Sequence, residues 1–156
     1  MTTVTVRNLI CGVALLGALG SATSLHAQIG VGTWVKKATP TAPAMAMTVE
    51  ACCGGGRRLI YHIDMKGTKM TLMLESAFDG KEVPVTIDGK PSAETMAIKR
   101  IDSHHLSNVL KMNGKPFGTS LATLSADGKT LTVVTDATSP AGGMAVGKTT
   151  EIWLLK

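Results

Sequence analysis

The chain has 156 residues, of which 17% are charged and 3% are aromatic, and its formal net charge at pH 7 is +5. So few aromatic side chains leave little to stack on bases or sugars, and we expect no nucleic-acid partner. The basic residues come mostly as neighbours, such as Lys36-Lys37 and Lys99-Arg100, whose side chains point to opposite faces of a strand and therefore form no patch.

Residues 1–27 have the layout of a secretory signal peptide, with Arg7 as the positive region, an apolar run from Leu9 to Leu19 and small residues after it. The run falls short of the roughly 20 residues that span a bilayer, so we expect a cleaved leader and no transmembrane segment in the mature chain. Cleavage after Ala27, or alternatively near Ala22, leaves one domain over residues 28–156. The protein is therefore expected to be exported, to the periplasm or out of the cell.

The mature chain reads as a series of short strands. The first opens at Gly32-Thr33-Trp34, and a linker over residues 38–44 follows, with two prolines that exclude it from a central ladder. Alternating apolar residues predict further strands over residues 45–52, 57–64 and 70–78. Pro84 interrupts the extended piece from Val83 to Ile87, which we place at an edge or in a loop.

Asn113-Gly114 is predicted to close a two-residue type I′ turn, because both residues tolerate positive φ. This turn sets a register in which Leu110 lies opposite Phe117 and Leu106 lies opposite Leu121. One face of the hairpin would then carry four large apolar side chains.

A second hairpin turns around Asp127-Gly128 and can close in two ways. A two-residue loop pairs Leu121 with Val134 and sends Val133 to the other face. A three-residue loop over residues 126–128, with its glycine in the left-handed region, pairs Leu121 with Val133 instead. We prefer the three-residue loop because it keeps the apolar residues together.

About nine strands are expected in all, ending with a strand over residues 149–155. Short strands with turns every 8 to 12 residues or so, and no helical pattern, are typical of an all-β sandwich or barrel. Consecutive hairpins favour a meander, and a long meander removes its exposed edges by closing. The predicted fold is all-β, an antiparallel meander that closes into a barrel of eight to ten strands.

Three runs and the G-x-W opening at Gly32-Thr33-Trp34 resemble a group of small exported bacterial proteins described as lipocalin-like. The runs cover residues 78–85 (FDGKEVPV), 94–102 (ETMAIKRID) and 125–133 (SADGKTLTV). The resemblance spans most of residues 32–134 and implies a lipocalin-like (calycin) barrel with Trp34 packed across its closed end. It implies a fold rather than an activity.

Methionine is the most suggestive functional feature, since several predicted strands carry it on the apolar face. Flexible thioethers suit an interior that adapts to a guest, although they also fill gaps in an ordinary core. We predict a cavity that holds a small apolar or amphipathic molecule, with Trp34 closing one end. Its predicted lining is Met47, Tyr61, Met70, Leu72, Met96, Ile98, Leu110 and Phe117.

Cys52 and Cys53 are the thiols that remain after processing. A bond between neighbours would span Cα atoms about 3.8 Å apart, below the usual range of disulfides, so we expect free thiols or a disulfide-linked dimer through either residue. The spacing predicts no cofactor or metal site. His62, His104 and His105 could join a soft copper site, but neighbours on a strand point to opposite faces, and surface or turn positions are preferred.

No motif of a nucleophile, a zinc protease or a phosphate loop is present, so no enzyme activity is predicted. Glu75, Glu94 and Glu151 could project into the barrel or form a polar cluster with Arg100 at its rim. The favoured function is an exported binding protein for a small apolar or amphipathic molecule. The alternatives are a ligand-free structural or interaction module of the cell envelope and, third, a soft-metal binding protein.

Overall fold

The computed structural model describes residues 29–39, 44–141 and 144–156, so the predicted signal peptide and part of the proline-containing linker lie outside the described residues. The described residues form ten strands and no helix. The strands are β1 (Gly32–Lys36), β2 (Ala44–Cys52), β3 (Gly56–Met65), β4 (Thr68–Ser76), β5 (Asp79–Ile87), β6 (Lys90–Arg100), β7 (His105–Met112), β8 (Lys115–Leu124), β9 (Thr130–Ala137) and β10 (Gly147–Leu155).

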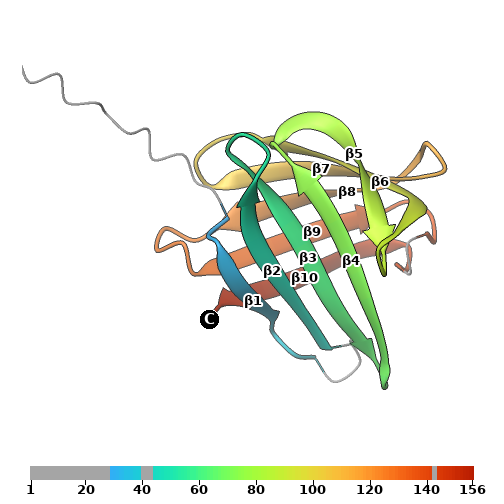
Figure 1. Ribbon diagram of the computed structural model, residues 1–156, viewed down its shortest axis with the longest axis horizontal. Helices are drawn as coiled ribbons and strands as arrows, with labels where there is room; N and C mark the ends of the chain where they lie inside the picture. Colours follow the sequence, from blue (N-terminus) through green and yellow to red (C-terminus); the bar gives the residue numbers. More distant parts are fainter. Residues whose placement is uncertain (1–28, 40–43, 142–143) are drawn as a thin grey trace, which may run out of the picture.

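The ten strands form a closed antiparallel barrel in which each strand pairs with its neighbours in sequence (Figure 1). β1 closes the barrel against β10, with Trp34 opposite Leu155 and Lys36 opposite Trp153. The predicted fold class is therefore confirmed. No helix among the described residues is long and apolar enough to cross a membrane.

Alternation of side chains along the strands builds the core inside the barrel. Met47, Val49, Leu59 and Leu74 are each no more than 2% exposed, and they lie on the inward faces of β2, β3 and β4, which pair in register. Trp34 has no exposed surface. Burying this apolar surface is the main stabilising term for a barrel of this size.

The predicted turn at Asn113-Gly114 is confirmed, since the two residues have φ angles of 52° and 74°. The register beyond it is wrong by one residue, because Leu110 lies opposite Gly118 rather than Phe117. Phe117 is the extra residue of a β-bulge and is 2% exposed. A bulge of one residue reverses the face of every side chain that follows it on the strand.

The bulge therefore also determines the pairing register of the second hairpin. Leu106 lies opposite Ala122, and Leu121, which we expected to face it, is 43% exposed. Leu121 pairs with Val134 on the outer face, so the preferred three-residue loop is wrong and the rejected register is the one observed. Gly128 nevertheless has a φ of 70°, in the left-handed region that we predicted for it.

β5 is paired unevenly. It joins β4 only through its last two residues, Thr86 and Ile87, while it pairs with β6 along most of its length with two register shifts. Pro84 is a strand residue opposite Thr95, in a part of β5 that does not pair with β4 and is therefore an edge, one of the two positions that we expected. Because this part of β5 has no ladder with β4, the missing N–H of the proline leaves no hydrogen bond unmade on that side.

Candidate functional site

One end of the barrel is closed by the residues that precede β1, and we call it the plugged end. Because the strands alternate in direction, the turns after β2, β6 and β8 lie at this end. Ile29 is 5% exposed, and its carbonyl accepts a hydrogen bond of 3.1 Å from Nε of Arg57. The carbonyl of Gly30 accepts one of 2.9 Å from Nε1 of Trp34. These bonds fasten the segment before β1 to the barrel.

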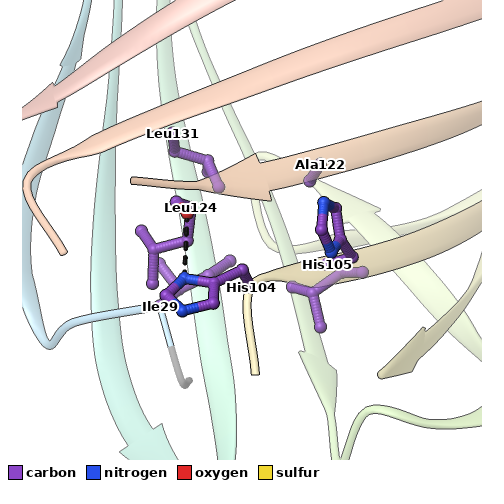
Figure 2. Close-up of a pocket in the computed structure, with 7 residues that line it drawn as sticks. Ile29, His104, His105, Ala122, Leu124 and Leu131 are labelled. Atoms are coloured by element: carbon purple, nitrogen blue, oxygen red, sulfur yellow. Dashed lines mark hydrogen bonds between the residues drawn. The ribbon is translucent and has the colours of Figure 1, made fainter. Parts of the chain in front are cut away.

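A small hollow lies at the plugged end (Figure 2), with a lining formed by Ile29, His104, His105, Leu106, Ala122, Leu124 and Leu131. Its volume of about 10 Å³ is close to the minimum that one water molecule needs. Nδ1 of His104 lies 3.1 Å from the carbonyl oxygen of Leu124, and Nδ1 of His105 lies 2.8 Å from the carboxylate of Asp102. The hollow has no space for an organic molecule in this conformation.

The residues predicted to line a cavity lie elsewhere in the barrel interior: Met47, Tyr61, Met70, Leu72, Met96, Ile98, Leu110 and Phe117. Met47, Ile98, Leu110 and Phe117 are each no more than 6% exposed, while Tyr61, Leu72 and Met96 are partly buried against the core. The structure thus brings five of the eight together in one core cluster, while Leu110 and Phe117 are buried outside that cluster and Met70 is only half-buried. None of the eight lines the hollow, and their contact with a ligand stays a prediction.

Arg100 brings a positive charge onto the inward side of the barrel. It is the last residue of β6, two positions after the buried Ile98, and lies opposite the buried Leu106. Its guanidinium carbon is 5.7 Å from the centre of the Phe78 ring. Nε and Nη2 of Arg100 are buried without a hydrogen-bond partner among the described residues, and Arg100 belongs to none of the ion pairs found in that part of the chain.

Asn108 adds a second unsatisfied group on the neighbouring strand. Its Oδ1 is buried without a hydrogen-bond partner among the described residues, and its Nδ2 lies 3.8 Å from Sδ of Met96. Asn108 lies opposite Ile98, so Arg100 and Asn108 are diagonal neighbours on one face of the β6–β7 pair. Such neighbours are roughly 7 to 8 Å apart, within reach of long side chains. Together they offer N–H donors and one acceptor.

Two further charged groups inside the barrel, Lys36 and Glu151, are paired with each other. Nζ of Lys36 lies 2.6 Å from Oε1 of Glu151, with side chains 12% and 30% exposed, and Nε1 of Trp153 donates to Oε2 of Glu151 at 3.3 Å. The Tyr61 ring meets the Trp153 ring edge-on, with centroids 5.8 Å apart. Burial, and to a lesser degree the charge of Glu151, raise the pKa of the Tyr61 hydroxyl. The polar groups of Lys36, Glu151 and Trp153 thus have partners within the chain and need no ligand.

Glu94, for which we considered both an inward position and a rim cluster with Arg100, projects inward. It is 4% exposed and lies opposite Met112 on the inward face of β6, and burial raises the pKa of its carboxyl group. Glu75, in contrast, lies on the outer face, where its Oε1 is 2.6 Å from Nη2 of Arg58. The predicted rim cluster with Arg100 is not formed.

Cys52 and Cys53 are joined to each other by a disulfide. The expectation of free thiols or a disulfide-linked dimer is therefore not supported, since both sulfur atoms are used within the chain. The turn makes the bond possible, because Cys53 has a φ of 50°. His62 lies on the outer face beside Thr48, and no histidine belongs to a metal-binding group within the described residues.

The comparisons with known proteins leave the chain without a match, whether to a family model, to a curated protein or to a solved structure. The lipocalin-like resemblance therefore stays a prediction.

Arg100 and Asn108 are not among the site residues predicted from the sequence. A signal was present for Arg100, because the alternation that turns Met96 and Ile98 inward continues to Arg100. No comparable signal marks Asn108, whose inward position depends on the pairing of β7 with β6.

Proposed function

We propose that this protein binds a small amphipathic anion inside its barrel, with Arg100 holding the charged group. The proposal rests on one observation, the two buried guanidinium nitrogens without a partner. A buried charge destabilises a protein by several kcal/mol or so unless it is paired. A carboxylate, sulfonate or phosphate presents two oxygens with the spacing of the guanidinium fork.

The side chains around Arg100 suit the apolar part of such a ligand. Ile98 and Leu106 are buried beside it, and Met96 follows on the same face of β6. Since the hollow at the plugged end measures about 10 Å³, the ligand must create its own space by displacing interior side chains. Methionine is the side chain that rearranges most readily, and the short β4–β5 ladder is a place where the barrel can widen.

We also propose that the protein is exported. The leader-like pattern of residues 1–27 supports export, and so does the Cys52–Cys53 disulfide, because disulfides persist in oxidising compartments. The barrel is then an extracytoplasmic carrier or receptor of its ligand, and we assign it no catalytic step.

Binding of dodecanoate and of dodecanol, which share a tail and differ in charge, tests the role of Arg100. We expect wild-type protein to bind dodecanoate more tightly in calorimetric titration, and Arg100→Met to weaken dodecanoate binding by about 10- to 100-fold while leaving dodecanol unchanged. Arg58→Met is the matched control, since Arg58 lies on the outer face between two carboxylates. Equal affinities of wild type and Arg100→Met for dodecanoate would contradict the proposal.

The small size of the hollow favours a second candidate, a ligand-free structural or interaction module of the cell envelope. A barrel interior filled by side chains is a rigid core rather than a container. This candidate predicts that neither dodecanoate nor dodecanol binds. It also predicts that Arg100→Met does not lower stability, because a buried unpaired charge is replaced by an apolar side chain of similar length.

A further inference from the structure

The turn after β2 gathers three groups that can act as metal ligands. Sγ of Cys52, Sγ of Cys53 and a carboxylate oxygen of Glu75 all lie within 4.8 Å of one another. Cys53 and Glu75 are exposed and Cys52 is half-buried, so solvent reaches the group. Because Glu75 points outward from β4, this group lies outside the barrel, and it has no part in the proposed ligand site at Arg100.

We propose that reduction of the Cys52–Cys53 bond converts this group into a binding site for a thiophilic divalent metal ion. The ligands are the two thiolates and the carboxylate of Glu75. Two molecules of a small thiol supply two electrons and two protons, which gives two cysteine thiols and one molecule of the thiol's own disulfide. The metal ion then binds as it displaces the two thiol protons. In the oxidised protein the sulfur atoms are bonded to each other and cannot serve as thiolate ligands.

The position of Glu75 fits a metal ligand. In a tetrahedral zinc site, with bonds of about 2.3 Å to sulfur and 2.0 Å to oxygen, ligand atoms lie roughly 3.5 Å apart. Oε2 of Glu75 is 3.9 Å from Sγ of Cys53, a contact that is no hydrogen bond, because a disulfide sulfur has no proton to donate. Oε1 is held by Arg58 Nε at 2.7 Å. Arg58 thereby orients Glu75 with its other oxygen toward the sulfur, as supporting groups do in metal sites.

The local charge also favours a cation. Arg58 bridges Glu75 and Glu50, with Nη1 of Arg58 3.1 Å from Oε2 of Glu50. Two carboxylates and one guanidinium give a net charge of −1 before any thiol ionises. Two thiolates make the charge −3, which attracts a divalent ion even at a solvent-exposed position. Glu50 touches only Arg58 within this group, so it serves as a matched control for Glu75.

Cadmium alone is the probe, since its thiolate charge-transfer absorption reports sulfur ligation directly. The test uses the full chain with Cys11→Ala as the parent, so that Cys52 and Cys53 are its only cysteines. We expect the reduced parent to bind one Cd²⁺ per chain with this absorption, and the oxidised parent to show none. Glu75→Gln should weaken binding at least about tenfold, and Glu50→Gln should leave it nearly unchanged.

Two results would overturn the proposal. Equal cadmium binding by the oxidised and reduced parent would place the metal elsewhere, and equal effects of Glu75→Gln and Glu50→Gln would remove Glu75 from the ligands. The redox comparison uses a single chain, so it decides the matter even if a variant folds poorly. A thermal melt of each variant, oxidised and reduced, separates loss of binding from loss of the fold.

Discussion

At the scale of single residues, the few polar side chains inside the barrel differ in how the cost of their burial is compensated. Lys36 and Glu151 satisfy each other, whereas the buried Glu94 and the half-buried Arg100, whose Nε and Nη2 are themselves buried, have no such pairing. A carboxyl group can escape the penalty of burial by holding its proton, while a guanidinium cannot lose its charge in a protein. Arg100 is for this reason the better indicator of a ligand.

Glu94 makes stability depend on pH. Burial raises the pKa of its carboxyl above the ordinary value of 4.5, so between the ordinary and the raised pKa the folded state binds more protons than the unfolded state. The free energy of unfolding should therefore fall as the pH rises through that window. Glu94→Gln should remove the contribution of Glu94 to this decrease in the free energy of unfolding. Urea midpoints measured from about pH 4.5 upward test this. An unchanged pH dependence would show that Glu94 ionises freely, and Glu75→Gln on the outer face is the control.

Gly56 is a position where the backbone leaves no space for a side chain. A Cβ there would lie 2.2 Å from the carbonyl oxygen of Ser76, so Gly56→Ala should lower the free energy of unfolding by about 2 kcal/mol or more. Gly128→Ala is the comparison, because Gly128 has a φ of 70° and no atom within 4 Å of such a Cβ, and it should lose only about 1 kcal/mol. Denaturant midpoints of the two variants decide this, and equal losses would argue against the close contact of β3 with β4.

At the scale of elements, the strands and tight turns could be predicted because their signals are local. A type I′ turn requires positive φ at both central residues, and Asn113 and Gly114 tolerate and adopt it. The bulge at Phe117 has no such signal, since a large apolar residue fits a regular inward position equally well. A single unpredicted bulge was enough to turn Leu121 outward and to give Val133 a different partner, Ala122, although Val133 packs against the core as expected.

The weakest ladder of the barrel should also be its most mobile one. β5 joins β4 at two residue pairs, whereas β8 is paired with both neighbours along most of its length. Backbone amides of β5 between Gly80 and Val85 should exchange with solvent at least about tenfold faster than those at the centre of β8. Hydrogen exchange followed by mass spectrometry or NMR measures this. Equal protection of the two strands would mean that the barrel does not open between β4 and β5.

At the scale of the whole molecule, closure of the barrel could be predicted from the series of hairpins, because closing a long meander abolishes both of its exposed edges. The side chains that fill the barrel could not be predicted from the sequence. They depend on which residues the bulge turns inward and on contacts that form only after the barrel closes. Met47 and Leu110, which we predicted to line a cavity, are buried, and their contact with a ligand stays a prediction. The unpaired charge of Arg100 became visible only once its neighbours were known.

The most direct test is the mass of the intact protein, purified from the cells that make it and measured under native and then denaturing conditions, for wild type and Arg100→Met side by side. A small amphipathic anion in the barrel predicts extra mass on the order of a few hundred daltons in the native wild type, lost on denaturation and absent from Arg100→Met. A bare mass for the native wild type, or the same bound molecule in both proteins, would contradict the binding of an anion at Arg100.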